Sequence, residues 1–494
     1  MRFKSETLPY YSSGYQAMGQ INQGALKQLR QRIQKIECTV VRALSKDDSF
    51  LSPDDAASIR WAMSLARITK VRVNKERPAD DVVIEHASDN YCAELYALLS
   101  LVIDPFGAVD KDKLKGLRQQ IARLGQAQRA DLLSLFSNLS QEALDDATRR
   151  RPLALTLSGG GGTSYVFVGA FLALEEGGLI PSVIAGSSMG AILGAYRSLT
   201  KSFCIDGLNQ LVQNTSWSKV AQPYSGASRF GLPATFRLYL RDVVGHQFQR
   251  GDEFIRLSEV AIPLRVCVAG LSSAISLKEE DLERYAHLLD DEKAKKLMGQ
   301  SQNKSIISII MDFAQKPLKA IYLGGDELTK EFDTLDAIGF SAAIPGIFHY
   351  DILRNDPRMV SLLTNLMNRE GVIRLIDGGF VDNLPSREAI RAVADGACDG
   401  FDPFVLSLDG FTPGLNRHIL FYPLMRFAVE NSREGHELSH LSIKFKNVLS
   451  PINLIPTKQT LHYAMENGYL EFSPHIAFIR KMVGPIPDPS WLKE

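Results

Sequence analysis

A serine flanked by small residues is the strongest candidate nucleophile in the chain. Ser188 lies at the centre of residues 186–190 (GSSMG), the GxSxG sequence of this 494-residue chain. A serine at a sharp turn between a strand and a helix projects its hydroxyl into a cleft from a strained backbone conformation. Gly186 and Gly190 would let the ends of the strand and the helix approach each other. Alone the motif is weak evidence of chemistry, because a glycine- and serine-rich turn can match it.

A run of four glycines supplies a second chemical feature. Residues 158–162 (SGGGG) follow an apolar run and precede a helical pattern. Backbone N–H groups at the start of a helix are unpaired and can hold an anion. In acyl transfer that anion is the tetrahedral oxyanion. A nucleotide phosphate is the competing anion, but this segment matches neither GxGxxG nor the P-loop sequence.

A carboxylate followed by two glycines is the third feature. Asp377 precedes Gly378 and Gly379 in residues 374–383 (RLIDGGFVDN). A carboxylate at the end of a strand, with small neighbours, can approach a hydroxyl closely and accept its proton. Asp–Gly pairs are usually turns, and the chain has three others, at 206–207, 399–400 and 409–410.

Short apolar runs alternate with helical patterns around these motifs. Residues 153–157 and 183–185 predict buried parallel strands, and helical patterns follow at 164–176 and 189–199. The strand, loop, helix, strand, turn, helix order predicts an α/β sandwich with a parallel sheet. Further strands are expected in three segments and a surface helical insertion in a fourth: 264–269, 319–323, 404–408, and 278–298 for the insertion.

Three ordered blocks resemble the patatin-like phospholipase family. The first is residues 153–196 (LALTLSGGGGTSYVFVGAFLALEEGGLIPSVIAGSSMGAILGAY), which has the glycine loop, a helix ending in ALEEGG and the GxSxG turn. The second is residues 339–348 (GFSAAIPGIF), and the third is residues 376–385 (IDGGFVDNLP). The resemblance covers about 151–410 and implies a patatin-like three-layer sandwich with a mainly parallel central sheet.

The resemblance also implies a mechanism. It assigns Ser188 as the nucleophile and Asp377 as its base, in a Ser–Asp dyad that needs no histidine, metal or cofactor. An oxyanion hole is implied at the glycine loop, and the substrates are phospholipids, lysophospholipids or other acyl esters at a membrane surface. Many relatives carry Arg or Lys and then Gly after the glycine run, where this chain has Thr163 and Ser164. Because of this departure, the enzyme could require a protein activator as a partner. The oxyanion glycines are Gly159, Gly160, Gly161 and Gly162.

The flanking regions predict two further units. Residues 1–150 have apolar residues at three- and four-residue spacing, which predicts an all-helical accessory module. Ser52 and Pro53 look like an N-cap and a first helical residue, and residues 104–107 (DPFG) look like a break. Residues 411–494 predict a helical and looped extension that packs on the catalytic domain of 151–410. The helices expected in the first unit are 24–45, 53–72, 90–103, 112–125 and 129–148.

Bulk properties narrow the functional class and the location. The chain has 56 basic and 56 acidic residues, so no net positive charge favours nucleic acid. The five cysteines are odd in number and lack CxxC spacing, which predicts buried free thiols in a reducing compartment. We find no signal peptide and no apolar stretch of transmembrane length, so we expect a cytoplasmic protein that associates peripherally with membranes. Export by a route that needs no signal peptide stays open.

Three rival interpretations remain at this stage. A degenerate site would make the protein a lipid-binding or regulatory protein, an idea that Thr163 and Ser164 motivate. Residues 436–440 (HELSH) match HExxH, so His436 and His440 could hold zinc in a peptidase, with Glu437 as base. Either histidine could instead complete a Ser–Asp–His triad in the order of the α/β-hydrolases. The polar, Gly-interrupted flank of HELSH favours a solvated helix face.

Overall fold

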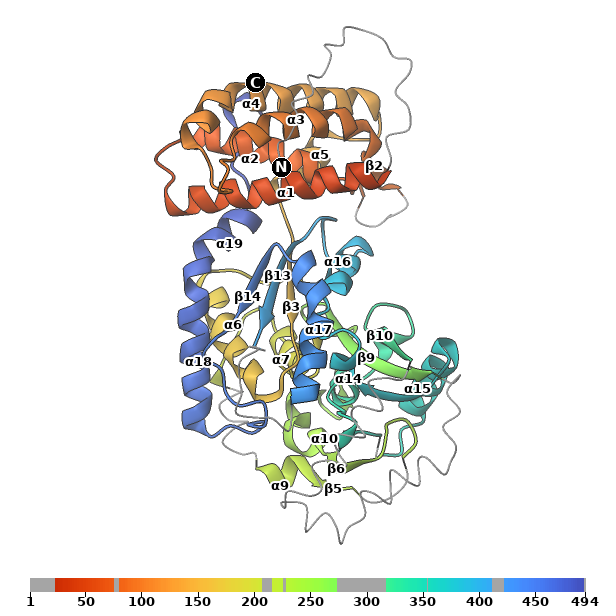
Figure 1. Cartoon of the computed structure of the whole chain (residues 1–494). Helices are drawn as coiled ribbons and strands as arrows, with labels where there is room; N and C mark the ends of the chain where they lie inside the picture. Colours follow the sequence, from red (N-terminus) through yellow and green to blue (C-terminus); the bar gives the residue numbers. More distant parts are fainter. Residues whose placement is uncertain are drawn as a thin grey trace.

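The chain folds into two units with separate hydrophobic cores. The computed structural model of the chain describes residues 23–74, 80–206, 216–224, 228–272, 317–352, 354–410 and 422–492. One core is built from the helices of residues 23–149, which we call the helical module. The larger core surrounds a central sheet that begins at Leu153. Figure 1 shows the helical module at one end of this sheet and the short helices α9 (Trp217–Val220) and α10 (Leu240–Val244) at the other.

The helical module packs around a fully buried tryptophan. Trp61 lies on α2, and Leu95, Ile121 and Leu144 contribute to the same core from the other helices. The side chain of Ser52 accepts a hydrogen bond from the N–H of Asp55, so the predicted N-cap is confirmed. The helices are α1 (Gln23–Lys46), α2 (Pro53–Arg67), α3 (Asp89–Leu101), α4 (Lys111–Leu135) and α5 (Gln141–Arg149).

Two boundaries in the module differ from the sequence prediction. The helix expected over 53–72 ends at Arg67, and β1 (Lys70–Val71) pairs with β2 (Val82–Val83). Branched side chains in residues 68–73 favour extended structure, so the unit is not entirely helical. The helices expected over 112–125 and 129–148 are instead divided after Leu135, because Ser140 caps a new helix by accepting from the N–H of Ala143.

The central sheet has seven strands and is mainly parallel. Its order is β10-β9-β4-β3-β13-β14, and β12 pairs with the second half of β9. The pairs β4–β9, β3–β4, β3–β13 and β13–β14 are parallel, whereas β10 and β12 are antiparallel to β9. The strands are β3 (Leu153–Leu157), β4 (Val183–Ser187), β9 (Leu264–Ser272), β10 (Leu318–Leu323), β12 (Val372–Asp377), β13 (Phe404–Asp409) and β14 (Leu441–Lys444).

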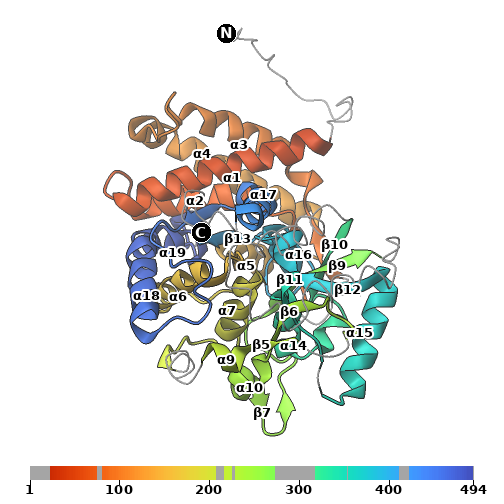
Figure 2. The same cartoon turned by 60° about the horizontal axis from the view of Figure 1, so that its bottom comes forward.

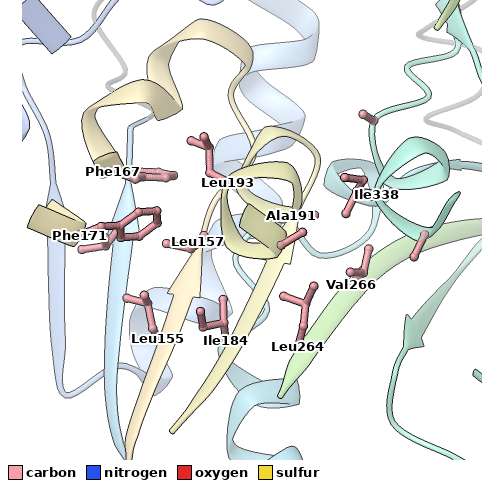
Figure 3. Close-up of a cluster of buried hydrophobic side chains, with 14 of the residues drawn as sticks. Leu155, Leu157, Phe167, Phe171, Ile184, Ala191, Leu193, Leu264, Val266 and Ile338 are labelled. Carbon is pink, nitrogen blue, oxygen red and sulfur yellow. The ribbon is translucent and has the colours of Figure 1, made fainter. Parts of the chain in front are cut away.

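Helices cover both faces of this sheet and make a three-layer sandwich. On one face, α6 (Val166–Glu176) and α7 (Met189–Ser198) pack on leucine, isoleucine and valine side chains of β3, β4 and β9 (Figure 3). On the other face, α16 (Ser386–Ala394) packs on the small side chains of the same strands, including Ala154 and Ala185. The parallel strands are therefore buried on both sides, as their continuous apolar sequences predict.

The C-terminal region is interwoven with both units. β14 extends the sheet, α18 (Lys458–Phe472) packs along α6, and α19 (Ile476–Val483) contacts α1. The chain then returns to the helical module, where Trp491 meets Trp61 edge to face with ring centroids 4.8 Å apart. Figures 1 and 2 show α18 on the same side of the sheet as α6.

The remaining elements surround the far end of the sheet. β5 (Ala221–Pro223), β6 (Ala234–Leu238) and β11 (Gly346–His349) form a small sheet, and β7 (Gln249–Arg250) pairs with β8 (Glu253–Phe254). Two more helices are α14 (Thr334–Ser341) and α15 (Pro357–Glu370). The helical insertion expected at 278–298 lies outside the described residues. None of the helices in the described ranges is long and apolar enough to span a bilayer.

All five cysteines lie in the described ranges and are unpaired. Cys92 and Cys267 are buried, as expected for structural thiols. Cys38 and Cys398 are partly buried, so the prediction of buried thiols holds only in part for them. Cys204 is exposed, so the prediction is wrong at this position, which follows α7 near the surface.

Candidate active site

Ser188 stands at a strained turn between β4 and α7. Its backbone has φ 51° and ψ −127°, and it is the one non-glycine residue with positive φ in the described ranges. Such a conformation is costly for a residue with a side chain, and it persists only where the surroundings impose it. A Cβ on Gly190 would lie 2.5 Å from the carbonyl oxygens of Leu157 and Ser158, so only glycine lets α7 begin this close to β3.

The strand register brings Asp377 to Ser188. β4 runs parallel to β9 and ends with Ser187 opposite Cys267. β12 runs antiparallel to β9 and ends with Asp377 opposite Val268, the next residue of β9. The carboxyl ends of β4 and β12 therefore meet, and Ser188 Oγ donates a hydrogen bond of 2.6 Å to Asp377 Oδ2.

The carboxyl of Asp377 is buried and held on both oxygens. Its Oδ1 accepts a 2.7 Å hydrogen bond from the N–H of Gly379, which leaves Oδ2 for Ser188. Burial raises the pKa of Asp377 to about 7, although the hydrogen bonds from Ser188 and Gly379 lower it. A carboxylate with a pKa near neutrality is suited to general base catalysis, because it can both take and return a proton.

Two N–H groups of the glycine loop remain free to bind an anion. The N–H of Gly159 donates to Asn383, and the N–H of Gly162 donates to the carbonyl of Pro451 at 3.0 Å. Those of Gly160 and Gly161 make no hydrogen bond within the described part of the chain, and both residues line the same cavity as Ser188. Of the four glycines expected as an oxyanion hole, Gly160 and Gly161 are therefore the two whose N–H groups make no hydrogen bond in the described residues.

The residues after the glycines close the loop on itself. Thr163 Oγ1 donates to the carbonyl of Gly160 at 3.0 Å, and Ser164 Oγ donates to the carbonyl of Ser158 at 3.3 Å. Both side chains are fully buried. Thr163 and Ser164, whose effect on the loop the sequence left open, are thus used for hydrogen bonds within the loop.

An apolar cavity opens at Ser188. It has a volume of about 420 Å³, and Asp377 is the only charged residue among the described residues that line it. A second apolar cavity of about 120 Å³ also touches Ser188 and lies between α7 and α10. The helical module contributes to neither. The walls of the first cavity include Trp217, Ile344, Phe348, Phe380, Phe427, Ala428, Pro451, Ile452 and Leu454.

Two side chains of the site, Ser341 and Asn383, were missed by the sequence analysis. Ser341 accepts a 2.9 Å hydrogen bond from the N–H of Ser188, and Asn383 bonds both the N–H and the carbonyl of Gly159. Both residues lie inside quoted blocks, at 339–348 and 376–385, so their positions were signalled but their roles were not. The C-terminal region, which was expected to pack on the catalytic domain, also lines the cavity, through Phe427, Ala428, Pro451, Ile452 and Leu454.

The two histidines of HELSH do not form a metal site. α17 (Tyr422–Leu438) ends before His440, which stacks on Phe404 and contacts Arg151. His436 bonds Asp409, and exposed Glu437 pairs with Arg433. The zinc-peptidase hypothesis is therefore not supported by the placement of these side chains. A triad is also not formed, because His436 pairs with Asp409 and the partners of Asp377 are Ser188 and Gly379.

The fold and site define an α/β sandwich with a serine and an aspartate paired at strand ends. Residues 155–390 match the family model of the patatin-like phospholipases, so this part of the chain is similar to that family. A search of the curated proteins finds no match to the chain. Patatin-like proteins are lipid acyl hydrolases, which are carboxylic ester hydrolases.

Proposed function

We propose that the protein hydrolyses lipid carboxylic esters through a Ser188–Asp377 dyad and an acyl-enzyme. The observation that carries this proposal is the 2.6 Å hydrogen bond from Ser188 Oγ, at its strained turn, to the buried carboxylate of Asp377. A serine hydroxyl becomes a useful nucleophile only when a neighbouring base accepts its proton. Asp377 has the position and the raised pKa that this role requires.

The reaction has two symmetrical halves. Ser188 Oγ attacks the ester carbonyl carbon while its proton passes to Asp377 Oδ2, and the carbonyl oxygen becomes an oxyanion facing the N–H groups of Gly160 and Gly161. The carbon–oxygen bond to the alcohol breaks, and the alcohol leaves with the proton from Asp377. Water then gives a proton to Asp377 and attacks the acyl group, and Ser188 leaves with that proton restored. An oxyanion donor typically contributes about 3 kcal/mol to lowering such a barrier.

The cavity favours an apolar acyl chain as the group that is transferred. Its described walls are aliphatic and aromatic side chains, and the one charge is the base itself. A pocket of this kind gains free energy from burying methylene groups, at about 0.8 kcal/mol each. The smaller cavity beside Ile192 and Val243 is also lined by Ser188, so it offers a second apolar space for part of an acyl chain.

The rim of the cavity supports action at a lipid surface. Trp217 and Ile452 line the cavity and are 42% and 52% exposed, and Val429, next to the cavity residue Ala428, is 37% exposed. Apolar side chains around an apolar opening can enter a lipid layer while the ester passes into the site. We therefore propose that these exposed apolar side chains mediate the peripheral association with membranes.

Labelling with a fluorophosphonate probe, read by intact mass, tests the proposal. We expect one adduct on the wild-type protein and none on Ser188→Ala, and hydrolysis of long-chain esters should be lost in Ser188→Ala and Asp377→Ala. Hydrolysis that survives in both variants would contradict the dyad. A wild-type protein that binds lipid vesicles but is neither labelled nor active, with membranes present, would instead indicate the lipid-binding or regulatory alternative.

A further inference from the structure

Helix α17 lies outside the family match but contacts the loop after Asp377, and it is linked to the glycine loop through Asn383 and Asp409. It contacts α16 and the turn of residues 378–380, and its residues Phe427 and Ala428 line the Ser188 cavity. Figure 1 shows it beside α16, along the sheet. A Cβ on Gly435 would lie 2.1 Å from the carbonyl oxygen of Leu384, so α17 packs backbone to backbone on the segment that follows Asp377.

Asn431 holds the loop that orients the base. Its side-chain Nδ2 donates a 2.9 Å hydrogen bond to the carbonyl of Gly379. Its backbone carbonyl accepts a hydrogen bond from the backbone N–H of Asn383. The N–H of the same Gly379 donates to Asp377 Oδ1. Fixing Gly379 therefore fixes which carboxylate oxygen is left to face Ser188.

Ser432 fixes the amide that holds the start of the glycine loop. Asn383 accepts from the N–H of Gly159 at 3.1 Å and donates to its carbonyl at 3.4 Å. Its Nδ2 also donates to Ser432 Oγ at 3.0 Å. Because Ser432 Oγ donates to the carbonyl of Ala428, it accepts from Asn383, and this sets the orientation of the Asn383 amide.

His436 holds the same loop from its other side. Its Nε2 lies 2.9 Å from Asp409 Oδ2, and Asp409 Oδ1 accepts a 2.8 Å hydrogen bond from Ser158 Oγ. Its Nδ1 lies 2.6 Å from Ser442 Oγ. Asp409 is 3% exposed, so His436 is a partner of a buried carboxylate. That carboxylate in turn holds Ser158, the residue before the four glycines.

We propose that α17 is a positioning element of the active site, and that Asn431, Ser432 and His436 hold the base loop and the oxyanion loop in register. The proposal rests on the hydrolytic function argued above. None of the three residues is placed to react with substrate. A displacement of catalytic groups by about 1 Å can lower a rate about a hundredfold, so we expect a loss of turnover with substrate affinity kept.

Single substitutions on α17 test the proposal in the full chain. Asn431→Ala, Ser432→Ala and His436→Ala should each lower kcat and the rate of fluorophosphonate labelling by roughly tenfold to a hundredfold, with KM changed much less. His436→Gln keeps an N–H donor for Asp409 and should restore most of the rate. Glu437→Ala is the matched control, because Glu437 is exposed on the same helix and pairs only with exposed Arg433.

Circular dichroism and thermal melting identify variants that fail to fold. If Asn431→Ala fails to fold, Asn431→Asp replaces it, because it keeps the size of the side chain but loses the Nδ2 donor to Gly379 and should lose rate in the same way. His436→Gln is the rescue variant and is compared with His436→Ala. Folded Asn431→Ala and His436→Ala variants that are labelled at the wild-type rate would overturn the proposal and leave the dyad standing. A loss that appears only as a higher KM would also overturn it. A wild-type protein without labelling or hydrolysis would overturn the dyad and this inference together.

Discussion

The backbone N–H of Ser188 donates a 2.9 Å hydrogen bond to Ser341 Oγ, and Ser341 Oγ donates a 2.6 Å hydrogen bond to the carbonyl of Cys267. One buried hydroxyl therefore ties the strained residue of the turn to the neighbouring strand β9. The N–H of Ser188 is consumed by this contact, so it is not available to an oxyanion. Ser341 contributes to holding φ 51° at Ser188.

Replacing Ser341 tests this restraint. Ser341→Ala leaves the N–H of Ser188 and the carbonyl of Cys267 without this partner, and we expect a loss of about 1–3 kcal/mol in the free energy of unfolding. The rate of fluorophosphonate labelling should also fall, because the turn can relax. Ser198→Ala removes a hydrogen bond within α7, to the carbonyl of Ala195, and should lose stability without losing labelling. Equal labelling of Ser341→Ala and wild type would contradict the restraint.

The pH dependence of hydrolysis follows from the ionisation of Asp377. Burial raises its pKa to about 7, and only the carboxylate can accept the proton of Ser188. We therefore expect kcat/KM to rise with pH through about 7 and then level off. Initial rates on a neutral ester between pH 5 and 9 measure this profile. A profile that is flat between pH 5 and 8 would show that Asp377 is ionised throughout, or is not the base.

The same carboxyl should make stability depend on pH. Between its unfolded pKa and about 7, Asp377 binds more protons folded than unfolded, so its contribution to stability falls as the pH rises. Asp377→Asn removes this ionisation. We expect the difference in urea midpoint between Asp377→Asn and wild type to shift in favour of the variant from pH 4.5 to pH 8. A difference that is constant with pH would contradict the raised pKa.

The apolar rim predicts binding to vesicles that does not require catalysis. In a Ser188→Ala background, Trp217→Ser, Val429→Ser and Ile452→Ser together should lower the partition onto phosphatidylcholine vesicles by roughly tenfold or more. Flotation measures the partition, and a blue shift of Trp217 fluorescence reports its insertion. Phe106→Ser is the control, because Phe106 is 95% exposed but lies on the distant helical module. An equal loss of vesicle binding in the control and in the triple variant would contradict the proposal that the rim binds the lipid surface.

The contact between the C-terminal Trp491 and the helical module is expected to stabilise that module. Trp491 packs on Trp61, and its Nε1 donates a 3.1 Å hydrogen bond to Ser58 Oγ. Trp491→Ala should destabilise the helical module by about 1–3 kcal/mol, which is less than for a fully buried tryptophan because Trp491 is half-buried. Hydrogen exchange in α2 and α4 measures the effect. Leu135→Ala, at a residue 66% exposed, is the control that should change little.

Much of the local structure could be predicted from the sequence. The continuous apolar run of 153–157 matches β3, and the runs at 264–269, 319–323 and 404–408 fall within β9, β10 and β13. β3, β9 and β13 are buried on both faces, so their sequences carry no polar alternation that could mislead. β10 lies at the end of the sheet, and its exposed Lys319 interrupts the apolar pattern. The boundary near Arg67 was predicted less well, because two short strands form there only through pairing between β1 and β2.

The sequence by itself determined which residue types could do chemistry: a serine between glycines, a glycine loop and an aspartate before two glycines. It could not separate Asp377 from the other Asp–Gly pairs on local grounds. The tertiary structure made that choice, because β4 and β12 end opposite adjacent residues of β9 and so bring Ser188 and Asp377 together across 189 positions of sequence. It also decided that α17 and the loop at 451–454 wall the site. Both decisions depend on strand register and helix packing between distant segments, which no local pattern encodes.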